Sequence, residues 1–460
     1  MSTLAYELRL LGRERSVWIL LFLWCAALIY ALATGWHVAA NLRSALTAFE
    51  ASAFKEFTEL RANTEAAERA GTPVGKALGY RASTPAVLRP RSLAFLAVGE
   101  SDLQPHSMLI SLFGSERSFG KGYELQSPVT LALGRFDLSF AVVVLMPLLL
   151  IALSYEQLAQ DRERHRLQLL ATQGDIQSLL WRRLLLRGAL VCAPLALITG
   201  VAALLAGGIA AVPAWLAWLA AALTWALFWL ALCAVTGARA RASGSAATLL
   251  IACWLALVLL LPAALSVLIQ QLAPSPSPLI TTMAIRQVEV QADRQRERII
   301  GRYVSDHPEL ERSAMEDELA RSRRYVIQQL YIAAALVPAS LGAQQQQLRQ
   351  RRIQRALYWL SPAQLLEQAF SNSAGTDSLR FEAFKEQARM FEKAWDATLT
   401  ASLMQGKTLD SQALASLPRF EFVQTRSWSS VWVAAWLAML AAVIVLVNRL
   451  RTRPQNFYPH

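Results

Sequence analysis

Charged residues are scarce in this chain, and six long stretches contain none at all. Only 17% of the 460 residues are Asp, Glu, Lys or Arg, whereas soluble domains average about 25%. A helix that spans a lipid bilayer needs about 20 mostly apolar residues. One such stretch would fit a buried helix of a soluble protein, but six predict a membrane protein. The stretches are 17–36, 138–155, 188–208, 215–236, 246–272 and 428–447.

The lack of charge inside these stretches also disfavours one class of transporter. Proton- and ion-coupled carriers place ionisable side chains within their spans. Here Asp137 and Glu156 only flank the second stretch, and Arg187 only borders the third. Energy for any movement of the helices is therefore expected from elsewhere. Pro147 lies inside the second stretch, where it can kink a helix or release backbone carbonyls.

Catalytic and metal-binding signatures are missing as well. All four cysteines fall inside apolar stretches, so no disulfide framework is predicted, and the five histidines show no paired ligand spacing. The segment 114–121 resembles a phosphate loop, but it has one residue too many between its glycines. Gly122 also stands where a Ser or Thr should bind Mg²⁺. We therefore expect no catalytic residue, metal site or cofactor in this chain, and no enzyme activity.

The net charge of +12 has a distribution that predicts orientation. Lys and Arg near the ends of spans concentrate on the cytoplasmic side. Arginines cluster in 1–16, 156–187, 237–245 and 448–460, whereas the turn at 209–214 carries no charge. Every second connection is thus Arg-rich, which predicts that both termini are cytoplasmic. Topology accounts for the basic excess without a nucleic-acid partner.

A cleaved signal peptide is an alternative interpretation of the N-terminus. A basic start, an apolar run and Ala31-Leu32-Ala33 are the features of such a peptide. However, Glu7 and Glu14 interrupt the basic region, and the apolar run is long for a signal sequence. Cleavage would also upset the alternation of charge, so the interpretation as a retained span is favoured.

The predicted fold is an all-α polytopic membrane protein with six transmembrane helices and two mainly helical extracytoplasmic domains. The second of these domains is expected to contain helices at 282–304, 308–330 and 378–404, and an apolar patch at 331–341. The first is expected to be helical up to Ala70, where Ala, Glu and Leu are frequent, and a strand could form around 92–98. The predicted segments are an interfacial helix (1–16), TM1 (17–36), extracytoplasmic domain 1 (37–136), TM2 (137–155), a cytoplasmic coupling region (156–187), TM3 (188–208), TM4 (214–236), TM5 (246–272), extracytoplasmic domain 2 (273–427), TM6 (428–447) and a cytoplasmic tail (448–460).

The coupling region has a specific order of residue types. Charged residues come first and leucines follow, which predicts a short amphipathic helix parallel to the membrane; a solvated surface-anchored loop is the alternative. The functional interpretation is a lever whose apolar side chains dock into a groove of a cytoplasmic motor. The residues concerned are Glu163, Arg164, His165, Arg166, Leu167, Leu169 and Leu170.

Motifs along the chain resemble those of type-2 ABC transporter permeases. The second span, with Gly134–Phe140, Pro147 and Ser154-Tyr155-Glu156, resembles the family signature. Further matches are Asp306–Pro308, Trp359–Ala363, Ala374–Asp377, Phe381–Phe384 and Leu417–Phe420. The nearest branch carries large extracytoplasmic insertions and is related to the permease of multicopper-enzyme maturation. In one departure, His165-Arg166 stands where the family usually has Gly-Thr, which puts the shape of the coupling turn in question.

This resemblance implies the membrane subunit of an exporter-like ATP-driven transporter in a bacterial inner membrane. It implies two copies of a separate ATPase that binds ATP and Mg²⁺, and a second permease copy or a sister permease. A partner on the periplasmic side and the lipid bilayer complete the expected contacts. The alternative is a signal-transmitting or scaffold membrane protein. The residues implied as family motif positions are Asp137, Pro147, Glu156, Pro362, Gly375 and Asp377.

Overall fold

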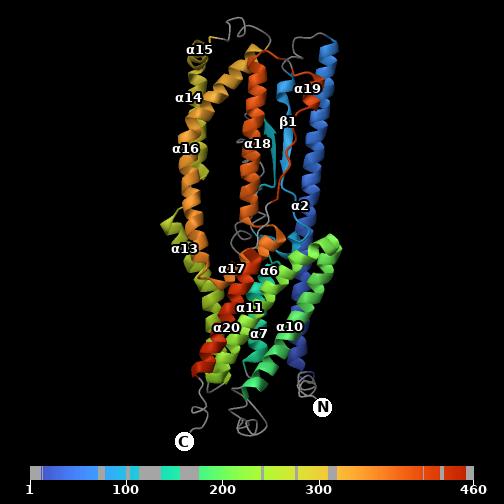
Figure 1. Ribbon diagram of the computed structural model, residues 1–460, viewed down its shortest axis with the longest axis vertical. Helices are drawn as coiled ribbons and strands as arrows, with labels where there is room; N and C mark the ends of the chain where they lie inside the picture. The colour runs from blue at the N-terminus through green and yellow to red at the C-terminus, as the bar shows by residue number, and fades with distance from the viewer. Residues whose placement is uncertain are drawn as a thin grey trace.

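The computed structural model describes residues 12, 14–70, 78–99, 104–112, 136–155, 176–239, 243–274, 278–308, 319–407, 409–424 and 429–451. These residues are predominantly helical, which confirms the predicted all-α class, and they include one two-stranded sheet. The molecule is elongated, with a helix bundle at one end and long helices projecting from it (Figure 1). Helix α2 (Arg15–Arg69) begins, and helix α20 (Ser429–Arg451) ends, at the bundle end.

The bundle is formed by the apolar stretches, two of which contain a break in helical pitch. In each case a π-helical segment ends two residues before a proline, Pro147 or Pro262. The helices α10 and α11 pack side by side on either side of a 3₁₀ turn, η5 (Gly208–Ala211). The elements besides α2 and α20 are α6 (Leu138–Phe140), η4 (Ala141–Leu145), α7 (Met146–Ser154), α10 (Ile176–Gly207), α11 (Val212–Arg239), α12 (Ser243–Trp254), η6 (Leu255–Leu260) and α13 (Leu261–Leu272).

Three continuous helical segments in the described part of the chain are long and apolar enough to cross a membrane. They are Arg15–Arg69, Leu180–Gly237 and Ser243–Leu272. A fourth is added if the bent pair Ala320–Pro338 and Leu341–Tyr358 counts as one span. The apolar helices Leu138–Ser154 and Val431–Leu446 are shorter. These segments identify the chain as a membrane protein.

Helix α11 lies at the centre of the bundle, where it contacts α7, α10 and α20. Its side chains Trp218, Trp225 and Trp229 are fully buried. Trp225 stacks on Phe228 and meets Trp229 edge to face, with ring centroids 5.3 and 5.6 Å apart. Large aromatic side chains fix helix positions strongly because each makes many dispersion contacts.

The projecting part has two arms. The first contains the outer half of α2, helix α18 (Ser378–Met404), helix α19 (Ser411–Ala415) and the antiparallel pair β1 (Ser83–Val87) and β2 (Ser107–Ser111). In the register of this pair Ser83 faces Ser111 and Val87 faces Ser107. Its core consists of buried side chains from both sequence halves, including Ile110, Phe384, Trp395 and Leu399.

The second arm contains α14 (Pro278–Arg294), α15 (Arg296–Asp306) and α16 (Ala320–Tyr358). It has a small core of its own, formed by Ala292, Ile299, Ile300, Ile327 and Ile332. Figure 1 shows α14 and α16 side by side, at a distance from α2.

One local prediction about these arms is corrected by the structure. Residues 92–98 form no strand: they contain the 3₁₀ turn η2 (Ala94–Leu96), and the strands lie on either side of it. The apolar patch at 331–341, predicted to be buried or interfacial, is partly buried: Ile332 joins the arm's core and Val337 is 48% exposed. The helical pattern predicted up to Ala70 is confirmed, and it is continuous with the first apolar stretch, since α2 extends from Arg15 to Arg69.

Candidate functional site: a polar pocket above the helix bundle

A short helix, α17 (Pro362–Ala374), lies between the bundle and the projecting arms. Its ends follow from the sequence: the Ser361 hydroxyl accepts a hydrogen bond from the N–H of Gln364, and Pro362 occupies the first turn. It ends at Gly375, whose φ of 74° is left-handed. The left-handed φ strains any residue other than glycine, and a Cβ here would also lie 2.4 Å from the Arg91 side chain.

One face of α17 is part of the bundle core. Leu365, Leu366, Ala369 and Phe370 are buried, and the Phe370 ring lies 4.8 Å from the Trp218 ring. The helix contacts α11, α20 and both π-helical segments, η4 and η6. It is therefore packed against the two bundle elements whose helical pitch is broken.

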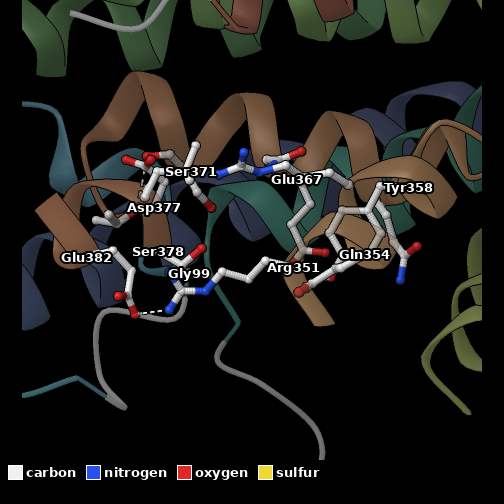
Figure 2. Close-up of a pocket in the computed structure, with 14 residues that line it drawn as sticks. Gly99, Arg351, Gln354, Tyr358, Glu367, Ser371, Asp377, Ser378 and Glu382 are labelled. Atoms are coloured by element: carbon white, nitrogen blue, oxygen red, sulfur yellow. Dashed lines mark hydrogen bonds and ion pairs between the residues drawn. The ribbon is translucent and has the colours of Figure 1, made fainter. Parts of the chain in front are cut away.

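The other face of α17 lines a pocket with a volume of about 160 Å³. The end of α16 and the start of α18 form the remaining walls (Figure 2). Polar side chains dominate the lining, with Leu379 as the one aliphatic side chain. The lining residues are Gly99, Arg351, Gln354, Arg355, Tyr358, Gln364, Glu367, Gln368, Ser371, Thr376, Asp377, Ser378, Leu379 and Glu382.

Charges of both signs meet in this pocket. Arg351 reaches from α16 toward α18 and pairs with Glu382, both side chains being about a third exposed (Figure 2). Asp377 precedes the first turn of α18, and its carboxylate accepts a hydrogen bond from Asn372 at 3.5 Å. Burial raises the pKa of Asp377, although nearby Arg91 opposes the shift.

Arg380, in the first turn of α18, binds backbone carbonyl groups next to the pocket. It is 8% exposed and donates to the carbonyl oxygens of Gly375, at 2.9 Å, and Arg89, at 2.8 Å. Burial lowers its pKa to about 10. Its guanidinium also lies 5.6 Å from the centre of the Phe422 ring. These contacts connect α18 to a segment that precedes it by almost 300 residues.

That segment, residues 88–99, is here called the strap. It passes between α2, α17 and the beginning of the second apolar stretch. The Asp137 carboxylate accepts from the N–H groups of Val98, at 2.9 Å, and Phe140, at 2.8 Å. One residue earlier in the strap, the Ala97 carbonyl accepts from the Thr376 hydroxyl at 2.8 Å. The strap therefore ties the start of α6 to the turn between α17 and α18.

The structure brings three of the residues singled out from the sequence, Gly375, Asp377 and Asp137, to the same region, while Pro362 lies at the other end of α17. Pro362 starts α17, Gly375 ends it, and Asp377 and Asp137 lie on either side of the strap. Pro147 lies deeper in the bundle, in the first turn of α7. Glu156 and the seven coupling residues, Glu163, Arg164, His165, Arg166, Leu167, Leu169 and Leu170, lie outside the described residues.

Apart from Asp377, the residues that line the pocket were missed by reasoning from sequence. Arg351 and Arg355 belong to an Arg-rich helical stretch that reads as a solvated face, and Glu367 and Glu382 lie on two other helices. The spacing of residues within any one helix does not predict that these arginines and glutamates line the same pocket. The signal that could have located them is the cap pair Ser361-Pro362 with Gly375, which places a turn at each end of α17. Within the described residues no group of three or more His, Cys, Asp or Glu could hold a metal ion.

Comparison with known proteins gives one match. Residues 279–423 match a family model described as a domain of unknown function, DUF3526. The matched stretch includes α15, α16, α17 and α18, and therefore most of the pocket. No curated protein and no solved structure matches the chain.

Proposed function

We propose that this chain is the membrane subunit of an exporter-like ATP-driven transporter of the type-2 class, located in a bacterial inner membrane. The observation that carries the proposal is the position of α17. It packs against two apolar elements, α6–α7 and α12–α13, that are each interrupted by a π-helical segment before a proline. Such interruptions are typical of functional positions in helices, and in membranes the carbonyls they release need partners.

Side chains from neighbouring elements supply such partners. Trp254, the last residue of α12, donates from Nε1 to the carbonyl oxygen of Val144 in η4, at 3.1 Å. Gln364 Nε2 donates to the Pro262 carbonyl at 3.5 Å, from α17 to α13. A side-chain donor can exchange one carbonyl acceptor for another when neighbouring helices shift. These two hydrogen bonds therefore support the proposal that the second and fifth apolar stretches move relative to α17.

In this proposal the membrane is crossed six times. The spans are the beginning of α2, α6–η4–α7, α10, α11, α12–η6–α13 and α20. The long apolar segment 180–237 supplies two of them because η5 separates α10 from α11. The bundle end with the beginning of α2 and the end of α20 is then cytoplasmic, in keeping with its arginines, and the two arms project outside.

Energy would come from a separate ATPase, two copies of which bind a pair of permease subunits. The region after α7 is the proposed docking element, with Leu167 and Leu170 in the ATPase groove and Glu163 beside them. The resemblance of this chain to type-2 permeases and the lack of ionisable residues in the apolar stretches support this division of labour. The chain itself would bind no nucleotide.

The proposal is tested by replacing Leu167 and Leu170 with Asp in the full chain, produced with its ATPase. We expect loss of co-purification and of permease-stimulated ATP hydrolysis, because a buried leucine in a groove cannot be exchanged for a carboxylate without loss of binding. Leu348→Asp, an exposed position on α16, is the matched control and should leave both unchanged. Normal association of the double variant would refute the coupling assignment.

One observation favours the alternative, a signal-transmitting or scaffold protein. Helix α2 is continuous from the bundle to the far end of the first arm, as expected of a rigid transmitter. The two functions are distinguished by measuring the movement of substrate across the membrane of vesicles that contain the protein. ATP-dependent movement of material across the membrane supports transport, whereas a response confined to a cytoplasmic kinase or protease supports signalling.

A further inference from the structure

The polar pocket has the composition of a site for a charged ligand. Pockets for apolar small molecules are lined mainly by hydrophobic and aromatic side chains. Here five of the lining side chains carry formal charge, and most of the others are amides or hydroxyls. At about 160 Å³ the cavity holds roughly five water molecules. That volume admits a compact head group.

The charges are divided between two walls. Arg351 and Arg355 come from α16, whereas Glu367, Asp377 and Glu382 come from α17 and α18. The Arg351–Glu382 pair neutralises one charge on each wall. Among the described residues Arg355 makes no ion pair, and the Asp377 carboxylate is reached by the Asn372 amide. A ligand that bridges the walls would therefore meet a guanidinium on one side and a carboxylate on the other.

A neutral acceptor completes the site. The side-chain oxygen of Gln364 is buried and has no hydrogen-bond partner among the described residues, while its amide nitrogen donates to Pro262. Buried acceptors of this kind are normally satisfied. An N–H donor on a ligand would supply the missing hydrogen bond.

The pocket also lies next to the end of the helix bundle. Trp359, at the end of α16, is 47% exposed and meets Trp436 of α20 edge to face, with ring centroids 5.9 Å apart. Leu360 beside it is 60% exposed. Exposed tryptophans next to apolar residues mark the boundary between hydrocarbon and head groups. The pocket is thus within reach of lipid head groups.

From these observations we infer that the pocket between α16, α17 and α18 binds a phosphoethanolamine group. The phosphate accepts hydrogen bonds from Arg355, whose planar fork suits phosphate oxygens, and the ammonium faces Asp377, Glu367 and the Gln364 oxygen. The group has two sources, the free zwitterion and the head group of a phospholipid. Binding requires no ATPase, so this inference stands or falls separately from the proposed function.

The test uses the purified full-length protein without the ATPase. Isothermal titration in detergent with phosphoethanolamine measures the free source, with inorganic phosphate and ethanolamine as half-ligands. Thermal unfolding in nanodiscs made with phosphatidylethanolamine, or with phosphatidylglycerol in its place, measures the lipid source. We expect saturable binding of the zwitterion that exceeds that of either half-ligand, or higher stability in the phosphatidylethanolamine discs. Either result supports the inference and identifies the source.

Matched variants locate the site. Arg355→Gln should weaken binding, or reduce the lipid-dependent shift, by about tenfold because a charge-assisted hydrogen bond is lost. Arg352→Gln changes an exposed arginine on the same helix that does not line the pocket, and should have no effect. The inference is overturned if the zwitterion binds no better than its half-ligands and the two lipids also stabilise equally. It is overturned as well if both variants behave like the unchanged protein.

Discussion

Asp137 satisfies backbone groups from two parts of the chain. It is 6% exposed and accepts from the N–H groups of Val98 and Phe140. Replacement by Ala leaves these donors buried without an acceptor and removes the cap of α6. Each unsatisfied donor costs about 1–3 kcal/mol. We therefore expect Asp137→Ala to lower the unfolding temperature in detergent clearly.

Two comparisons make this first prediction specific. Asp137→Asn keeps one side-chain acceptor and should lose less stability. Asp306→Ala, at an exposed helix end, should change little because its contact with Arg302 is long and solvent-exposed. Equal stability of Asp137→Ala and the unchanged protein would contradict the role of this residue in holding the strap.

Gly35 shows why a small side chain is needed where α2 passes the strap. A Cβ on Gly35 would lie 2.2 Å from the Phe95 carbonyl oxygen, a backbone atom that cannot move alone. Gly35→Ala should therefore destabilise the protein by separating α2 from η2. Gly301→Ala is the matched control, because nothing lies within 4 Å of its Cβ position in α15.

The two glycine variants are predicted to differ in sign. In an exposed helix interior, Ala is more favourable than Gly by about 0.5–1 kcal/mol. Thermal unfolding should thus show a loss for Gly35→Ala and a small gain for Gly301→Ala. A gain for both would mean that α2 and the strap are not in close contact.

His106 should make stability depend on pH. Burial, assisted by Arg380, lowers the pKa of His106 in the folded protein below its usual value of 6.5. As pH falls from about 7.5 to 5.5, the unfolded chain takes up this proton more readily than the folded protein, so stability decreases. The raised pKa of Asp377 acts in the opposite direction, because on acidification the folded protein takes up this proton at a higher pH than the unfolded chain does.

The measurement is the unfolding temperature across this pH range. The unchanged protein should lose more stability on acidification than His106→Gln, which cannot take up the proton. Parallel curves for the two proteins would exclude His106 as the source of the dependence.

At the scale of elements, one aromatic contact makes a large contribution to holding α17 in the bundle. Phe370 is fully buried against Trp218 of α11. Truncation of a buried phenylalanine to alanine costs about 3–5 kcal/mol. Phe370→Ala is expected to reduce stability strongly, whereas Leu360→Ala, 60% exposed just before α17, should have little effect on unfolding in detergent. Similar unfolding temperatures for the two variants would show that α17 is not anchored in the bundle.

The positions of most bundle helices could be predicted from sequence because apolarity alone specifies them. The stretch 246–272, for example, coincides closely with α12, η6 and α13. The residues after Trp36 are good helix formers with no proline, so helix up to Ala70 could be predicted as well, and α2 ends at Arg69. The sequence pattern did not predict that the first span and this outer helix form one unbroken element. The π-helical segments also left no signal beyond their prolines.

The pocket was unpredictable for a different reason. Its walls depend on long-range contacts, such as that of Thr376 with Ala97, which no local pattern encodes. Cap residues Ser361 and Gly375 do specify the ends of α17, and the resemblance drew attention to Pro362, Gly375 and Asp377. Only the fold shows that Arg351, from a separate arm, faces them.

At the scale of the whole molecule, α2 allows the orientation to be tested on one helix. In a variant without native cysteines, Lys55→Cys should react with a membrane-impermeant maleimide added to intact cells, because this exposed position lies in the first arm. Glu14→Cys, before the start of the same helix, should react only after the cells are opened. Labelling of both positions from outside would overturn the proposed orientation.

The length of α2 has a mechanical consequence. At 1.5 Å per residue its 55 residues extend over about 82 Å, and they wind through about 15 turns. A stiff rod of this kind carries torsion as well as thrust, so a small twist of its base reaches the far tip with little loss. Deletion of a single residue in its outer half would shorten the rod by about 1.5 Å but turn the tip by about 100°. A partner that binds the tip is therefore affected far more by rotation of the helix about its axis than by a change in its length.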